Sequence, residues 1–162
     1  MEKPLRIRAL ERATKYIGVK EHPAGTNRGP LIDRWCRMAN GLVGYPWCSA
    51  FLCAMYQEEG YIIPDPRRAS VGFFEAWAAR SGYVVKRPFR GDVVCYRFDA
   101  DNWPDHIGFI EKVLALRWRG DQFIGWVRTI EGNTSWGNDA NGGQVQRRWR
   151  WINRAKFCRI PG

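Results

Sequence analysis

Residues 44–51 read Gly-Tyr-Pro-Trp-Cys-Ser-Ala-Phe, a stretch in which a turn leads directly into an apolar helical segment. Apolar residues then recur at helical spacing as far as Met55 and Tyr56, and Gly60 ends the pattern. This spacing predicts Cys48 in the first turn of a helix, with its sulfur directed toward the sheet rather than the solvent. The free N–H groups and the positive dipole end of a first turn favour a thiolate, the nucleophilic form of cysteine.

The chain around this stretch predicts helices first and strands second. Helical periodicity recurs in three further segments, residues 10–17, 30–40 and 70–81, and a glycine follows each of them. Short apolar runs separated by turn residues predict four strands, at residues 93–96, 107–116, 123–130 and 145–151. Helices that precede an antiparallel sheet along the chain define the α+β class.

Length and composition are those of one folded domain. The chain has 162 residues, of which 45% are hydrophobic and 26% charged, so a disordered or fibrous polymer is excluded. Because no repeat or linker interrupts it, residues 1–162 are predicted to form a single domain without a separate wall-binding domain. Lysine and arginine number 26 against 16 aspartates and glutamates, a net charge of +10. This charge indicates an anionic partner, such as nucleic acid, a membrane face or a cell wall.

Cysteine and histidine usage argues against a metal module. The five cysteines form no Cys-x-x-Cys pair and only two histidines exist, so a structural zinc site is excluded. The N-terminus has no apolar core of a secretory signal, and no apolar run approaches the ~20 residues of a membrane helix. We therefore expect synthesis in a reducing cytosol and free thiols. Four cysteines lie in apolar patterns and are predicted to pack in the core: Cys36, Cys53, Cys95 and Cys158.

A cysteine nucleophile needs an imidazole to hold its proton and a third group to orient that imidazole. His22 precedes Pro23 in a polar segment and is predicted to lie in a loop. His106 opens a predicted strand, and Gly108, two residues further on the same face, leaves space beside its ring. His106 is therefore the candidate base.

The orienting group is expected near the end of the next strand. Glu131 and Asn133 are two residues apart, which places both on one side of an extended chain, and either could accept from the imidazole N–H. Each candidate also has a structural interpretation, because Cys48 has aromatic neighbours typical of a core and residues 131–133 could form a turn. The order of helical cysteine, strand histidine and strand Glu/Asn favours the catalytic interpretation.

In this order the chain resembles the CHAP domain, the cysteine- and histidine-dependent amidohydrolase/peptidase family with a papain-like fold. The resemblance extends from about Leu5 to Ile160. The stretches that carry it, in chain order, are Asn27-Arg28-Gly29-Pro30 with Ile32-Asp33, Pro46-Trp47-Cys48-Ser49-Ala50-Phe51, Gly91-Asp92-Val93-Val94, Asp105-His106-Ile107-Gly108-Phe109-Ile110, Glu131-Gly132-Asn133-Thr134-Ser135 and Asn141-Gly142-Gly143-Gln144-Val145.

The resemblance implies a papain-like fold, with N-terminal helices packed on a C-terminal antiparallel sheet. It also implies roles for four residues: Cys48 as nucleophile, His106 as general base, Glu131 as orienting acid and Asn133 as the polar residue beside that acid. The sequence departs from the family at two points. Some relatives carry an acidic calcium loop before the cysteine, but residues 41–45 contain no carboxylate, so no metal or cofactor is predicted. Some relatives also have Gln where this chain has Trp47, which leaves Tyr45 as a weak candidate for the side-chain oxyanion donor.

By resemblance, the expected activity is hydrolysis of an amide in bacterial peptidoglycan, either as N-acetylmuramoyl-L-alanine amidase or as endopeptidase. We expect a monomeric phage endolysin, made in the cytoplasm and acting on the cell wall after release, whose positive charge favours the anionic envelope. A toxin amidase delivered between bacteria would use the same chemistry.

A non-catalytic nucleic-acid binder is the alternative from another class. Arginines and tryptophans interleave at residues 117–119 and 147–151, as they do on surfaces that bind single strands. The structural interpretation of this pattern is a strand with tryptophans in the core and arginines in solvent. No nucleic-acid-binding motif accompanies the pattern, so no specific nucleic-acid partner is predicted.

Overall fold

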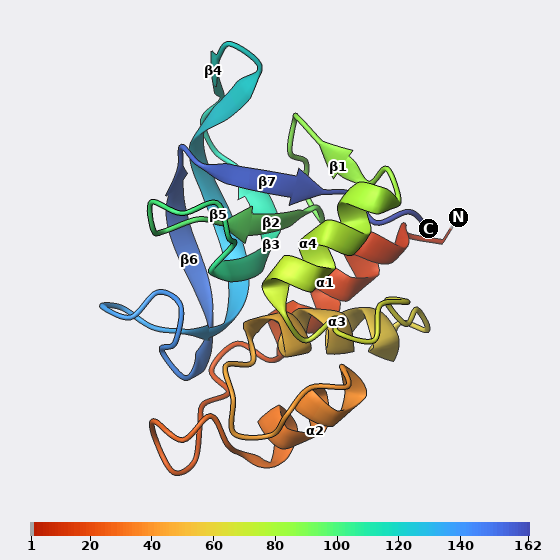
Figure 1. Cartoon of the computed structure of the whole chain (residues 1–162), viewed down its shortest axis with the longest axis vertical. Coiled ribbons are helices and arrows are strands. Elements are labelled where there is room, and N and C mark those ends of the chain that lie inside the picture. The colour runs from red at the N-terminus through yellow and green to blue at the C-terminus, as the bar shows by residue number, and fades with distance from the viewer. Residues whose placement is uncertain (1) are drawn as a thin grey trace.

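A computed structural model describes residues 2–162 and shows four helices followed by a curled antiparallel sheet (Figure 1). The helices are α1 (Leu5–Lys15), α2 (Pro30–Met38), α3 (Cys48–Glu58) and α4 (Val71–Arg80). Proline at the first position of α2 has its φ already set for a helix and lacks an N–H that would otherwise be unpaired. The architecture confirms the predicted α+β class and is consistent with a papain-like fold.

Seven strands form the sheet, and every pair of neighbours is antiparallel. They are β1 (Val84–Val85), β2 (Val93–Tyr96), β3 (His106–Val113), β4 (Arg117–Arg119), β5 (Gln122–Thr134), β6 (Gln144–Ile152) and β7 (Ala155–Cys158). Their order is β1-β7-β2-β3-β5-β4, with β6 paired to β5. The long strands β3, β5 and β6 therefore lie side by side, and they carry the polar residues discussed below.

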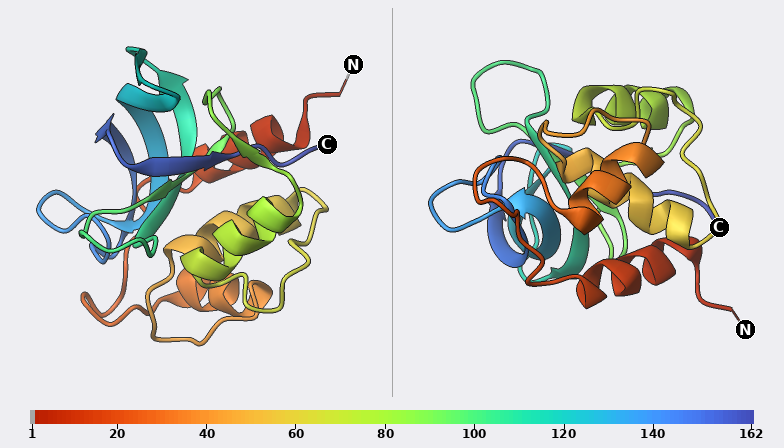
Figure 2. Two further views of the ribbon diagram at one scale, coloured as in Figure 1. Left: turned by 45° about the horizontal axis from the view of Figure 1, so that its top comes forward. Right: turned by 90° about the horizontal axis from the view of Figure 1, so that it is seen from below.

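Helix α3 is the centre of the hydrophobic core. Every residue from Cys48 to Tyr56 is buried, because α3 contacts the other three helices as well as β3 and β5. A helix that is apolar on all sides is stable only when it is enclosed in this way. Helix α2 packs on the side of α3 that faces away from the sheet (Figure 1), and in the left view of Figure 2 helices α2, α3 and α4 lie together on one side of the sheet. No helix within residues 2–162 has the length and apolarity needed to cross a membrane.

The predicted elements differ from the observed ones mainly at their ends. Helix α1 stops at Lys15, so Ile17 lies outside it and is 37% exposed instead of packing in the core. Three short strands, β1, β4 and β7, were absent from the prediction, since each is short and, unlike the fully buried β2, contains exposed residues that interrupt any apolar run. Strand β5 continues beyond Ile130 to Thr134, which places residues 131–133 in the sheet rather than in a turn.

Candidate active site

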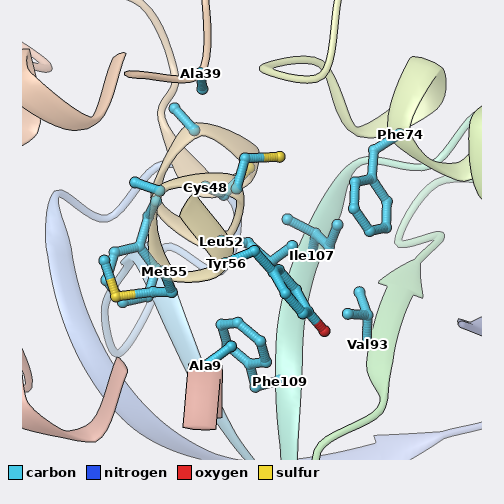
Figure 3. Packing of buried hydrophobic residues seen from close by; sticks show 14 of the residues in the cluster. Ala9, Ala39, Cys48, Leu52, Met55, Tyr56, Phe74, Val93, Ile107 and Phe109 are labelled. Carbon is cyan, nitrogen blue, oxygen red and sulfur yellow. The ribbon is translucent and has the colours of Figure 1, made fainter. Parts of the chain in front are cut away.

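Cys48 is the first residue of α3 and lies at the base of a groove of about 750 Å³. Its side chain points out of the first turn, on the side of the helix where Ile107 of β3 lies (Figure 3). The residue is only 5% exposed, so the groove is the route by which solvent or substrate reaches the sulfur. This placement agrees with the orientation predicted from helical spacing, and it puts the sulfur beside the free N–H groups of the first turn.

His106 begins β3 and is completely buried. Its Nε2 atom lies 2.9 Å from Oε2 of Glu131, whereas its buried Nδ1 atom makes no hydrogen bond. Burial lowers the pKa of His106, but its interactions with the neighbouring Cys48 and Glu131 side chains oppose this effect and raise the pKa to about 9. Glu131 thus holds the imidazole through Nε2 and leaves Nδ1 unpartnered on the other side of the ring.

Glu131 lies inside the curled sheet on β5 and is also completely buried. Its Oε1 accepts hydrogen bonds from the Tyr96 hydroxyl at 2.8 Å and from Thr129 Oγ1 at 2.6 Å. The guanidinium of Arg150 donates to both oxygens, with Nε lying 3.0 Å from Oε1. Burial alone raises the pKa of this carboxyl, but the bonds from His106 and Arg150 lower it below its usual range. Glu131 is therefore an ionised carboxylate that accepts from every neighbour.

Asn133, the other candidate for the orienting group, does not reach His106. Its side chain donates to Asn141 Oδ1 at 3.0 Å and accepts from the Gly143 N–H at 3.1 Å. The backbone at Asn133 has φ of 57°, and the register of β5 with β6 shifts between Glu131 and Thr134. A left-handed residue interrupts the alternation of an extended chain, so the expectation that both side chains face His106 is wrong. Asn133 instead closes the loop formed by residues 133–143.

Arg150 and Arg148 belong to this site although the sequence analysis did not single them out. Both lie on β6 and are less than a tenth exposed, whereas Trp149 and Trp151 between and beside them are 52% and 46% exposed. The interpretation of this segment as buried tryptophans and solvated arginines is therefore reversed. The strict alternation of Arg and Trp did predict two faces, but it could not identify the inner one. The buried guanidiniums of Arg148 and Arg150 are bonded to carboxylates and are therefore unavailable to phosphates, whereas residues 117–119 are exposed.

The groove has aromatic walls and no side-chain donor from the residues just ahead of Cys48. Trp47 is fully buried and its Nε1 donates to Glu21 at 3.0 Å, so it does not face the groove. Tyr45 is 60% exposed and lines a neighbouring pocket instead. Residues from four segments line the groove, among them Ser70, Phe98, Trp103 and Asp139.

The residues present do not fit a calcium site. The segment ahead of Cys48 has no carboxylate, and nowhere in residues 2–162 do three or more His, Cys, Asp or Glu side chains gather as metal ligands. All five cysteines are free and buried, and the four assigned to the core by their spacing lie there.

Comparison with known families agrees with this geometry. The family model of the CHAP domain matches residues 40–133, a segment that contains Cys48, His106 and Glu131. The chain belongs to the CHAP domain family and is therefore, at the level of the family, a cysteine/histidine amidohydrolase or peptidase. Comparisons with curated proteins and with solved structures found no match.

Proposed function

We propose that this protein hydrolyses an amide bond of bacterial peptidoglycan, with Cys48 as nucleophile, His106 as acid and base, and Glu131 as the orienting acid. The observation that carries the proposal is the buried His106–Glu131 pair, whose Nδ1 atom is unpartnered, next to Cys48 at the start of α3 in the lining of an open groove. A nucleophile, a base and an orienting group in this order form the constellation needed for acyl transfer.

In the first half of the reaction, the Cys48 thiolate attacks the carbonyl carbon of the scissile amide. The oxyanion that forms lies beside the N–H groups of the first turn of α3. His106 then gives its proton to the leaving nitrogen, the C–N bond breaks and the amine departs. The product is a thioester between Cys48 and the acyl group, with a neutral imidazole beside it.

In the second half, water enters where the amine left and His106 takes one of its protons. The resulting hydroxide adds to the thioester carbonyl, the C–S bond breaks and the carboxylic acid product is released. The thiolate and the imidazolium are thereby restored. Glu131 remains ionised throughout, and it keeps the imidazole oriented and stabilises its protonated form.

Membership of the CHAP family supports peptidoglycan as the substrate, and the groove is large enough for a stretch of peptide or muropeptide. The net charge of +10 favours approach to an anionic wall. We extend the proposal to a bacteriolytic endolysin that acts at the cell wall after leaving the cytoplasm. The scissile bond is either the link between muramic acid and alanine or a bond of the stem or cross-bridge peptide.

The test is digestion of purified peptidoglycan followed by mass spectrometry of the soluble muropeptides, with Cys48→Ala as the inactive control. Free N-acetylmuramic ends identify an amidase, and intact sugar–stem units with split cross-links identify an endopeptidase. Loss of turbidity of outer-membrane-permeabilised cells tests the lytic role. Undigested peptidoglycan with folded wild-type protein contradicts the proposed substrate. A Cys48→Ala protein that digests like the wild type contradicts the proposed nucleophile.

A further inference from the structure

Arg150 is a buried cation that contacts both the catalytic acid and the wall of the groove. Its side chain is 8% exposed, and its guanidinium donates to both oxygens of Glu131. Through Nη1 it also donates to Oδ1 of Asp139 at 2.7 Å, and Asp139 lines the groove above Cys48. No other arginine described in the structure joins the triad to the substrate groove in this way.

The surroundings of Arg150 hold its guanidinium in one orientation. Its Cζ atom lies 5.4 Å from the ring centroids of Tyr96 and Phe98, within the range of a cation–π contact. The Tyr96 ring in turn stacks on His106, with centroids 5.9 Å apart. Arg148 donates to the same Asp139 oxygen at 2.7 Å. The Asp139 carboxylate that accepts from Arg150 is therefore fixed by a second arginine. A planar guanidinium that is bonded to carboxylates at both Nη atoms is suited to orient the Glu131 carboxylate.

We propose that Arg150 is a positioning residue of this site, which holds the Glu131 carboxylate against His106 and ties it to Asp139 in the groove wall. The inference takes the roles of Cys48 and His106 from the proposed function. What it adds is the residue that balances their charges. The titratable and charged groups that face the site come from every element around it: Cys48 on α3, the Tyr96 hydroxyl on β2, His106 on β3, Glu131 on β5, Arg148 and Arg150 on β6, and Asp99, Asp105 and Asp139 in the groove lining.

The balance of buried charge explains why a cation is needed here. Without Arg150, deprotonation of Cys48 leaves two anions and one imidazolium in a buried space. With Arg150, the same step leaves two buried anions and two buried cations close together, while Asp139 is about half exposed and is paired with Arg148 as well. Because a nearby cation favours the ionised form of an acid, Arg150 favours the thiolate and keeps the carboxylate ionised. Removing the charge should therefore move thiolate formation to higher pH.

The experiment measures the pH dependence of Cys48 alkylation by iodoacetamide, read as the modified peptide by mass spectrometry, and needs no substrate. In Arg150→Met we expect the midpoint of the acid limb to move to higher pH by on the order of one unit. In Arg150→Lys the charge remains and the midpoint should stay near the wild-type value, while loss of the fork lowers kcat on peptidoglycan with little change in KM. Arg147→Met is the matched control, because Arg147 lies on the same strand but pairs with Glu111 on the surface.

Thermal unfolding shows which variants are folded. If Arg150→Met does not fold, Arg150→Gln replaces it, since the amide keeps a donor for Glu131 but has no charge, and the same shift is expected. A wild-type midpoint in a folded Met or Gln variant overturns the proposal, as does a displaced midpoint in Arg150→Lys. Failure of the proposed function can be told apart from failure of this proposal. If the wild type does not hydrolyse peptidoglycan but the alkylation midpoints of the variants still differ as expected, then the proposed function fails and the role of Arg150 stands.

Discussion

Gly108 of β3 lies directly against Glu131 of β5, and only a residue without a side chain fits there. A Cβ atom placed on Gly108 would come within 2.6 Å of Glu131 Cγ and 3.2 Å of the Ile130 carbonyl oxygen. The register of the two strands, with Phe109 opposite Ile130, accounts for this closeness, because it puts Gly108 opposite Glu131. The absent side chain is what allows the carboxylate to reach His106 along the inner surface of the sheet.

Gly108→Ala is therefore expected to displace Glu131 and to lower activity by at least about tenfold. Overpacking of this buried site should also cost roughly 1–3 kcal/mol of stability. Hydrolysis rates and urea unfolding measure the two effects. Ile32→Val on α2 controls for stability loss alone, since it removes one buried methyl group on the side of α3 that faces away from the sheet. Full activity in Gly108→Ala would contradict the proposed role of this gap.

Glu131→Gln should lower kcat by on the order of 10²- to 10⁴-fold with little change in KM, because an amide orients the imidazole without stabilising its charge. The acid limb of Cys48 alkylation should also move to higher pH. Without the negative charge of Glu131 the imidazolium form of His106 is less stable, so it stabilises the thiolate less. Asn133→Ala should act through loop stability instead, at a cost of about 1–2 kcal/mol for its two lost hydrogen bonds. A shifted alkylation profile in Asn133→Ala with an unchanged one in Glu131→Gln would reverse this assignment.

The raised pKa of His106, about 9 against an ordinary value near 6.5, predicts the alkaline limb of activity. Hydrolysis should fall as pH rises through about 9, because the leaving amine then finds no imidazolium proton. The folded state holds this proton more tightly than the unfolded chain. Its contribution to stability is therefore complete below pH ~6.5 and is lost as pH rises to about 9. Urea unfolding of the wild type and of His106→Gln at pH 6 and at pH 9.5 measures this contribution. The difference in unfolding free energy between the two proteins should be smaller at pH 9.5 than at pH 6.

Alkylation at neutral pH should modify Cys48 first, as measured by peptide mass spectrometry. Cys48 lines the open groove, whereas burial raises the pKa of Cys36 to about 11 and that of Cys53 to about 12. Alanine at the other four cysteine positions should lower the melting temperature rather than kcat. Faster modification of any of these than of Cys48 in folded protein would argue against the nucleophile.

Activity on purified peptidoglycan should be equal in excess EDTA and in added calcium. The segment before Cys48 lacks the oxygen ligands that a hard cation requires. Purified peptidoglycan is the appropriate substrate, because EDTA and calcium both alter whole-cell envelopes. Strong stimulation by calcium would show that another part of the chain supplies the ligands.

Some features of this protein follow from local sequence alone. The helix that begins at Cys48, the strand Val93–Tyr96 and the start of the strand carrying His106 lie within a residue of their predicted positions. Turn residues, first-turn positions and apolar periodicity act over a few neighbouring residues, so the order of cysteine, histidine and glutamate was visible before any fold was known. Once the helix packs on the strands that carry His106 and Glu131, the three side chains come together in one site.

Other features were decided by tertiary structure. Arg148 and Arg150 alternate with tryptophans, and the period of two defines two faces of β6 without saying which one is enclosed. The arginine face became the inner one because Arg150 pairs there with the buried carboxylate of Glu131, and Arg148 and Arg150 both bond Asp139 in the loop between β5 and β6. In the same way, the left-handed backbone of Asn133 turned its side chain toward Asn141, which no pattern of residue types in an extended strand predicts.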